Sequence, residues 1–291
     1  MWVTIKLFLA ALGVLLIVGC GSGGDDSPTE DDADVGASSE LTPGDGAALV
    51  VNSTADADER DGELTLREAM ALVTGQLSLD DLTEQEQANI EGSPGADSSD
   101  IIIFDEEVFD PNDPATISLG STLPTLEAGG DIIDGGGGVI VGGQSSFDCF
   151  LVLSTGNVIA GLQILGCQTA VILGPASANN TIGSYDGRQP NVLSGNYVGV
   201  EIRGRANAIQ GNLIGTDASG TQADPNTAEG IWIAPGATDN LIGGGAPGAR
   251  NVISGNALFG ISIDGAGTTG NLVIGNYIGV DITGQVSLGN K

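Results

Sequence analysis

Two stretches decide the fold of this chain: Asn191-Val-Leu-Ser-Gly-Asn196 and Asn251-Val-Ile-Ser-Gly-Asn256, which are near copies sixty residues apart. Other blocks return in the same order and at nearly the same displacement: Asn180-Thr-Ile-Gly183 as Asn240-Leu-Ile-Gly243, Gly199-Val-Glu-Ile-Arg-Gly204 as Gly260-Ile-Ser-Ile-Asp-Gly265, and Asn207-Ala-Ile-Gln-Gly-Asn-Leu-Ile-Gly215 as Asn271-Leu-Val-Ile-Gly-Asn-Tyr-Ile-Gly279. Self-similarity at such a period is typical of repeat architectures, in which each unit packs on its neighbours.

Each block carries an apolar run of only a few residues, bounded by Gly and Asn. Short β-branched runs with such boundaries indicate short strands, and Gly and Asn tolerate the left-handed backbone of tight corners. If one coil takes roughly twenty residues, the unit holds about three coils. The alternating residues expected to point inward are Val192, Val200, Ile202, Ile209, Ile231, Ile233, Ile261, Ile263 and Val273. The sequence therefore predicts an all-β fold, a parallel β-helix (solenoid) over residues 101–291.

Asparagine opens many of these runs. The residues in question are Asn157, Asn180, Asn191, Asn207, Asn240, Asn251 and Asn271. Amide side chains at one corner of successive coils can hydrogen-bond to one another and to corner backbone groups. We expect some of them to form an inward asparagine ladder.

The composition excludes several classes of function. There is no His among the 291 residues, which rules out Ser-His-Asp and Cys-His nucleophile pairs and His-ligated zinc. Only 8 Lys and Arg stand against 38 Asp and Glu, giving a net charge of −30 and arguing against nucleic acid as a partner. With 4% aromatic residues, the core must be built from Val, Ile, Leu and Ala. Neutral, cationic or divalent-metal partners fit this balance better.

The first nineteen residues have the features of a signal peptide. Lys6 precedes an apolar run, Leu7 to Val18, that is short for a membrane span, and Gly19-Cys20 follows. This ending resembles a bacterial lipobox, in which the Cys becomes the lipidated first residue; an ordinary secretory signal is the alternative. The resemblance implies lipidation at Cys20, membrane attachment through the lipid and export. Gly21, in place of Asp, favours an outer-membrane lipoprotein, either periplasmic or surface-exposed.

Residues 20–46 are expected to be a disordered acidic tether. Six of the ten positions from Asp25 to Asp34 are acidic, without hydrophobic periodicity, so little apolar surface is available to offset ordering entropy. A calcium-binding acidic run is the alternative, but the segment lacks the Gly-hinged spacing of a known calcium loop.

Residues 47–100 are expected to form an N-terminal cap. Thr65 and Glu68 have the spacing of a capping box, ahead of a helix with an apolar face. The stretch "VNSTADADERDGELTLREAM" at 51–70, which includes Arg67, resembles the CSLREA-type module found ahead of right-handed parallel β-helices in exported bacterial proteins. The leading Cys of that motif is Leu64 here. The resemblance implies a short α-helical cap laid over the exposed first coil.

Residues from Ile101 onward resemble the pectate-lyase-like right-handed parallel β-helix superfamily, especially its bacterial repeat proteins. That superfamily includes polysaccharide lyases and hydrolases, but a polygalacturonase-like site would need a His. A lyase-like site would be a calcium site of acidic residues beside a basic one. The candidates for it are Arg188, Arg203, Arg205 and Arg250 with Asp186, Glu201, Asp217, Asp264 and Asp281.

Three residues mark a candidate binding edge. Asp217 and Asp281 occupy equivalent repeat positions, where they fit a calcium or carbohydrate edge or, alternatively, the first position of a β-turn that ends in Gly. Trp232 lies between Ile231 and Ile233, so alternation places its ring outside, where it fits a sugar or partner, or packs under the inserted 216–230 loop. No residue is assigned a catalytic role.

Cys149 and Cys167 are eighteen residues apart, near one coil length, which fits either a disulfide between adjacent coils or two buried thiols. The chain stops at Gly289-Asn290-Lys291, partway through a repeat, so we expect a truncated C-terminus or, alternatively, one that a partner completes.

From these features we expect a cell-surface scaffold or adhesin-like binding protein that is non-catalytic, with a glycan or a surface protein as partner. The alternative is a calcium-dependent polysaccharide lyase or a carbohydrate-binding β-helix. No cofactor is expected; Ca²⁺ is the one candidate ion.

Overall fold

The computed structural model describes residues 46–183 and 188–291. Cys20, the signal segment, nearly all of the proposed tether and Asp186 lie outside the described residues. The described chain belongs to one compact unit. Its helices are short: α1 (Leu66–Val73), α2 (Glu84–Gln87), and two 3-10 turns at Leu79–Asp81 and Pro247–Ala249. None of the helices in this part of the chain has the length and apolar character needed to cross a bilayer.

The rest of the regular structure is strand, which confirms the all-β class. The strands of the N-terminal part are β1 (Ala48–Val51), β2 (Ile90–Glu91), β3 (Ile101–Phe104), β4 (Ala115–Ser118), β5 (Ile132–Gly142), β6 (Phe150–Val152), β7 (Val158–Leu165) and β8 (Thr169–Leu173). Those that follow are β9 (Thr181–Gly183), β10 (Val192–Ser194), β11 (Val198–Ile202), β12 (Ala208–Gln210), β13 (Leu213–Ile214) and β14 (Ile231–Ile233). The last are β15 (Leu241–Gly243), β16 (Val252–Ile253), β17 (Ile261–Ile263), β18 (Leu272–Ile274) and β19 (Tyr277–Ile278).

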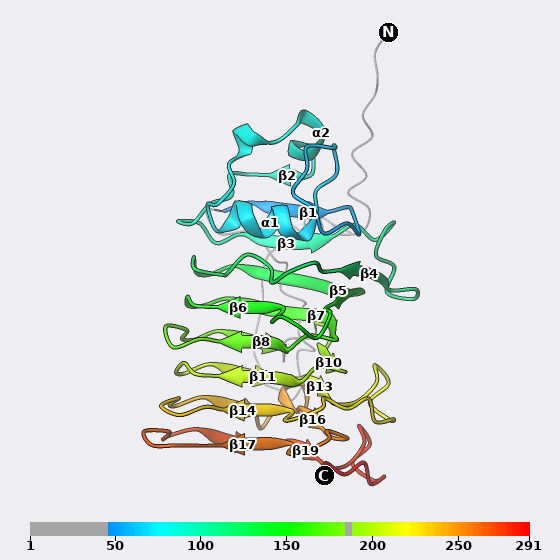
Figure 1. Ribbon diagram of the computed structural model, residues 1–291, viewed down its shortest axis with the longest axis vertical. Coiled ribbons are helices and arrows are strands. Elements are labelled where there is room, and N and C mark those ends of the chain that lie inside the picture. The colour runs from blue at the N-terminus through cyan, green and yellow to red at the C-terminus, as the bar shows by residue number, and fades with distance from the viewer. Residues whose placement is uncertain (1–45, 184–187) are drawn as a thin grey trace, which may run out of the picture. The chain divides into compact units, whose positions relative to one another are not determined.

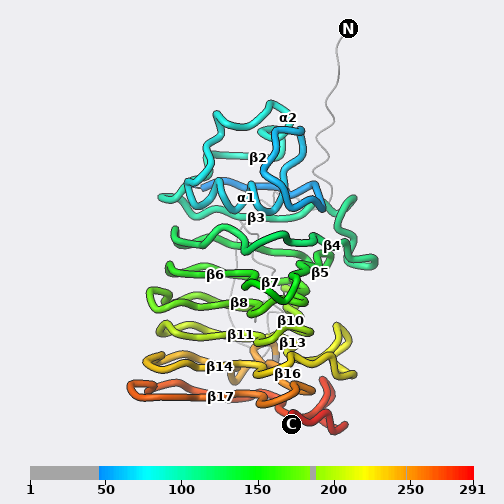
Figure 2. Tube along the Cα trace, in the orientation of Figure 1, coloured from blue at the N-terminus to red at the C-terminus, as the bar shows by residue number. Residues whose placement is uncertain are grey.

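From β8 onward, each strand pairs in parallel with the strand three places later in the chain. One row runs β6-β8-β11-β14-β17, a second β7-β9-β12-β15-β18 and a third β7-β10-β13-β16-β19. The long β7 joins the last two rows, because Ile159 pairs with β9 while Ile164 pairs with β10. The strands lie in successive layers, and the trace passes from blue to red from one layer to the next (Figures 1 and 2).

The interior is lined by alternate aliphatic residues from all three rows. Val200 and Ile202 of β11 stack on Ile231 and Ile233 of β14, and all four are fully buried. Each such burial contributes about 1.5–3 kcal/mol.

Val192 and Ile263 were both expected to point inward, and neither belongs to the main core. Leu193, not Val192, belongs to the main core; Val192 packs outside it in a small cluster with Leu213 and Val252. Neighbouring residues of a strand point to opposite faces, and Leu193 pairs with the core residue Ile164, so Val192 points away from the main core. Ile263 is 52% exposed because β17 is the last strand of its row.

The asparagine ladder is confirmed, and it is built from paired hydrogen bonds. The backbone N and the Nδ2 of Asn180 both donate to Oδ1 of Asn207, at 3.1 and 3.0 Å, and Asn207 donates in the same way to Asn240 at 2.9 and 3.1 Å. We call this series the first ladder; its asparagines are Asn157, Asn180, Asn207, Asn240 and Asn271. The polar side chains are buried without loss of hydrogen bonds, which is the condition for placing them in a core.

Two further ladders occupy the other corners. The second consists of Asn191, Asn212, Asn251 and Asn276, and the third of Asn196, Asn226, Asn256 and Asn290. The sequence pattern indicates a ladder formed by some of seven asparagines; of these, Asn191 and Asn251 belong to the second ladder and the other five to the first.

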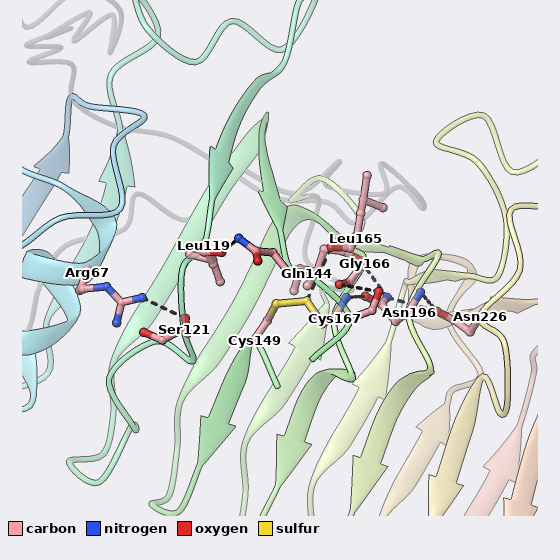
Figure 3. The surroundings of a disulfide bond; sticks show 12 residues. Arg67, Leu119, Ser121, Gln144, Cys149, Leu165, Gly166, Cys167, Asn196 and Asn226 are labelled. Atoms are coloured by element: carbon pink, nitrogen blue, oxygen red, sulfur yellow. Dashed lines mark hydrogen bonds between the residues drawn. A yellow bond between two sulfur atoms is a disulfide. The ribbon is translucent and has the colours of Figure 1, made fainter. Parts of the chain in front are cut away.

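Cys149 and Cys167 form a disulfide with a Cα–Cα distance of 5.8 Å. It joins the corners that precede β6 and β8, and the backbone N of Cys167 donates to Oδ1 of Asn196 at 2.8 Å. Figure 3 shows the disulfide beside Asn196 and Asn226. The cross-link therefore continues the third ladder toward the N-terminal end of the stack.

The N-terminal segment covers the first layers. Thr65 and Glu68 form the capping box at the start of α1, and β1 pairs in parallel with β3. Arg67 makes a two-pronged ion pair with Asp56, at 2.8 and 2.9 Å, and donates to the carbonyl oxygens of Ser121 and Thr122. Arg67 thus ties α1 to the loop after β4.

Candidate functional site

On the outer face of the β6-β8-β11-β14-β17 row, apolar, acidic, aromatic and hydroxyl side chains follow one another from strand to strand. Ile172, Glu201, Trp232 and Ser262 occupy one register position on four consecutive strands. Neighbouring strands lie about 4.8 Å apart, so each of these side chains has the next beside it. The aliphatic residues on either side of Ile172, Glu201 and Trp232, such as Val200 and Ile202, are buried in the core.

A pocket of about 450 Å³ opens on this face. Its lining residues are Pro175, Glu201, Arg203, Trp232, Ala234, Pro235 and Gly236. They come from β11, from β14 and from the corners that follow β8, β11 and β14. We call it the Trp232 pocket. Its size falls in the range of small-ligand sites, roughly 300–1,000 Å³.

The charged groups of the pocket are paired, with one partner buried and the other open. Nε of Arg203 donates to Oε1 of Glu201 at 2.5 Å. The Glu201 side chain is 6% exposed and that of Arg203 is 47% exposed. The pairing orients the guanidinium, whose remaining N–H groups are on an exposed side chain.

The indole of Trp232 is held by a carboxylate from the corner that follows β17. Its Nε1 donates to Oδ2 of Asp264 at 3.1 Å, and the same oxygen accepts from Oγ of Ser262 at 3.0 Å. Trp232 is only partly buried. The ring is therefore oriented by a hydrogen bond while part of its surface is accessible to a ligand.

This arrangement suits a ligand with one apolar face and several hydroxyls. A flat indole face packs against C–H groups, and a guanidinium and carboxylates donate to and accept from hydroxyls at the ring edge. Pyranose sugars have this chemistry.

Asp217 and Asp281 lie elsewhere, each within its own turn. Asp217 accepts from Oγ of Ser219 and from the backbone N of Thr221 and Gln222, at 2.8–3.1 Å. Burial acts to raise the pKa of Asp217, but these hydrogen bonds together hold it below its usual value.

Asp281 repeats that pattern with Thr283, Gln285 and Val286. The hydrogen bond from the Thr283 hydroxyl is the main cause of its lowered pKa. The two turns stack, since the backbone N of Ile282 donates to the carbonyl of Gly220 at 2.9 Å. Each carboxylate thus stabilises its own turn, and Trp232 does not lie beside either of them.

The other charged candidates are dispersed. Arg188 pairs with Asp134 at 3.1 Å, and Arg250 donates to the carbonyl of Gly275 and lies 4.1 Å from the centre of the Tyr277 ring. Arg205 is exposed at a corner. Within residues 46–183 and 188–291, no three His, Cys, Asp or Glu side chains are grouped as ligands for one metal ion. Of the lyase-like set, Glu201, Arg203 and Asp264 gather around Trp232.

We did not predict from the sequence that these three charged residues lie together around Trp232, although the repeats contain a pattern that indicates it. The blocks Val200-Glu-Ile-Arg203, Ile231-Trp-Ile-Ala234 and Ile261-Ser-Ile-Asp264 align without gaps. The alignment puts Trp232 beside Glu201 and puts Asp264 in the column of Arg203.

Comparison of the chain with protein-family models, with curated proteins and with solved structures finds no match.

Proposed function

We propose that this chain is a lipid-anchored cell-surface protein that binds a glycan in the Trp232 pocket and acts as an adhesin-like scaffold, without catalysis. In this proposal Cys20 carries the lipid, residues 20–46 are the tether, and the ordered part is a right-handed parallel β-helix with a CSLREA-type cap.

One observation carries the binding function: a partly exposed indole, oriented by Asp264, lies beside an exposed guanidinium that is itself oriented by Glu201. A site with fixed groups loses less entropy when the ligand binds. Three ladders of buried hydrogen bonds at the corners of the stack add rigidity.

The fold assignment is supported by the regular pairing of each strand with the one three places later. Parallel strands joined by crossovers are right-handed in about 98% of cases, so that hand is proposed for each coil. The cap assignment is supported by the position of Arg67, which links the helix to the first layers through Asp56 and the loop after β4.

A glycan array probed with the full chain tests the proposal. The expected result is selective binding that Trp232→Ala abolishes and that Tyr197→Ala leaves intact; Tyr197 is an exposed aromatic residue that does not line the pocket. Equal binding by the Trp232→Ala variant, or no bound glycan, would contradict it.

Incubation of the protein with the same glycans distinguishes binding from enzymatic cleavage. Arg203 beside a buried carboxylate is the feature that favours a polysaccharide lyase. Release of unsaturated sugar products in the presence of Ca²⁺, lost in Arg203→Ala, would replace the binding function by that activity. Unchanged glycan recovered after incubation supports the scaffold.

The anchor has its own test, metabolic labelling with a radioactive fatty acid. We expect label in the wild-type chain and none in Cys20→Ser. Label in both the wild type and Cys20→Ser would show that the lipid is not attached at Cys20.

A further inference from the structure

The first ladder does not begin with asparagine. Its two N-terminal positions are Asp100, just before β3, and Asp131, just before β5. The backbone N of Asp100 donates to Oδ1 of Asp131 at 3.2 Å, and the backbone N of Asp131 donates to Oδ1 of Asn157 at 3.1 Å. These are the same backbone contacts that link the asparagines farther along the ladder. The two aspartates thus stand at the junction between the cap and the stack.

Asp131 lacks the donor that its position requires. In Asn157, Asn180 and Asn207, the Nδ2 group donates to Oδ1 of the next asparagine, at 2.9–3.1 Å. In Asp131 that atom is replaced by Oδ2, which is buried and has no hydrogen-bond partner among the described residues. An ionised Oδ2 would thus meet another acceptor, the Asn157 oxygen, in a site without water exposure.

The groups facing Asp131 do not compensate this charge. On the β3 side, the carboxylate of Asp100 already accepts from the backbone N of Ala47 at 2.7 Å and of Gly95 at 3.0 Å. On the β7 side, Asn157 does not titrate. A buried carboxylate with a like charge on one side and an acceptor on the other is strongly disfavoured.

We propose that Asp131 is a proton-dependent link between the cap and the stack: in the folded chain it keeps its proton and donates it from Oδ2 to Oδ1 of Asn157, and when that proton passes to solvent the new charge faces Asp100 and loosens β1 and β3 from β5.

Electrostatics agree with this geometry. Burial raises the pKa of Asp131 to about 7; the hydrogen bond from Asp100 acts against the rise and the charge of Asp100 adds to it. Because the folded pKa lies above the ordinary value of 3.8, the contribution to stability is complete below about pH 4 and is lost as the pH rises through about 7. Asp217 and Asp281, whose pKa values are lowered, act in the opposite sense and lose their contribution only when the pH falls.

Hydrogen exchange followed by mass spectrometry on the full chain tests the proposal. After correction for intrinsic exchange rates, protection of the β1 and β3 peptides relative to β11 should fall about a hundredfold between about pH 5 and about pH 8. Asp131→Asn supplies the missing amide donor, so in this variant the relative protection should stay constant over that range.

Asn180→Asp is the matched control. It places a carboxyl where the Nδ2 of Asn180 donates to Oδ1 of Asn207, so the β9 and β12 peptides, whose corners this contact joins, should acquire a pH dependence like that of β1 and β3 in the wild type. Protection of β1 and β3 that does not change with pH in the wild type would overturn the proposal. So would a pH dependence that persists in Asp131→Asn or fails to appear in Asn180→Asp.

Discussion

One asparagine at each corner performs several tasks in this chain. The Oδ1 atom of Asn207 accepts two hydrogen bonds from Asn180, while its Nδ2 donates to Oδ1 of Asn240 and to Oγ of Ser177. Removal of this side chain leaves buried donors and an acceptor without partners, and each such group costs about 1–3 kcal/mol.

We therefore predict that Asn207→Ala lowers the free energy of unfolding by about 3–5 kcal/mol. Asn112→Ala, at an exposed asparagine whose side chain bonds to Asp110, should change it by less than about 1 kcal/mol. Urea unfolding followed by circular dichroism measures both. Similar losses in the two variants would show that the ladder is not a source of stability.

At this scale the sequence predicted less than the structure contains. Asparagines that open an apolar run were singled out from the sequence, but not those of the third ladder, such as Asn196 and Asn226, which close one or lie in a loop. The spacing between ladder partners also varies, from 21 residues for Asn191 and Asn212 to 39 for Asn212 and Asn251. Because corner loops differ in length, ladder partners follow from three-dimensional stacking and not from a fixed period.

The helical cap is the element that the sequence described best. The capping box is local, so Thr65 and Glu68 could be identified from their spacing alone. The role of Arg67 could not, because its partners Ser121 and Thr122 lie more than fifty residues away.

We predict that Arg67→Lys destabilises the cap, since lysine cannot form the two-pronged bond to Asp56. The loss should be about 2–3 kcal/mol and should appear as faster hydrogen exchange in β1 and α1. Arg205→Lys, at an exposed corner, is the control and should leave exchange unchanged. Equal protection of α1 from hydrogen exchange in Arg67→Lys and in the wild type would contradict the stabilising role of Arg67.

The disulfide acts on another element, the corner shared by β6 and β8. A cross-link closing a loop of this length stabilises by about 3 kcal/mol, mainly by restricting the unfolded chain. The double variant Cys149→Ala with Cys167→Ala should therefore lower the free energy of unfolding by that amount. If the variant unfolds at the same denaturant concentration as the oxidised wild type, the cross-link contributes nothing.

At the scale of the whole molecule, charge opposes compaction. The chain carries 38 acidic and 8 basic residues, and such an imbalance destabilises the folded state through self-repulsion. We predict that the unfolding temperature rises with NaCl from about 0.01 to about 1 M, since screening shortens the range of repulsion. Choline chloride should give the same rise. A rise with one salt alone would indicate a specific ion site and not general screening.

The repeat alone was sufficient to predict an all-β chain of short strands stacked on one another. The binding face was harder to foresee. Its residues are scattered from Pro175 to Asp264, and only the register of β11, β14 and β17 places them together. The repeated aspartates Asp217 and Asp281 predicted a binding edge, but they repeat because each stabilises the turn at an equivalent corner.

The most direct test of the account uses the fluorescence of Trp232. The sequence has two tryptophans, Trp2 and Trp232, so a full chain with Trp2→Phe reports on the pocket alone. With a glycan selected on the array, we predict a shifted emission and reduced quenching by acrylamide, both saturating at the concentration at which binding saturates. A glycan that binds while the emission and quenching of Trp232 stay unchanged would contradict the assignment of the site.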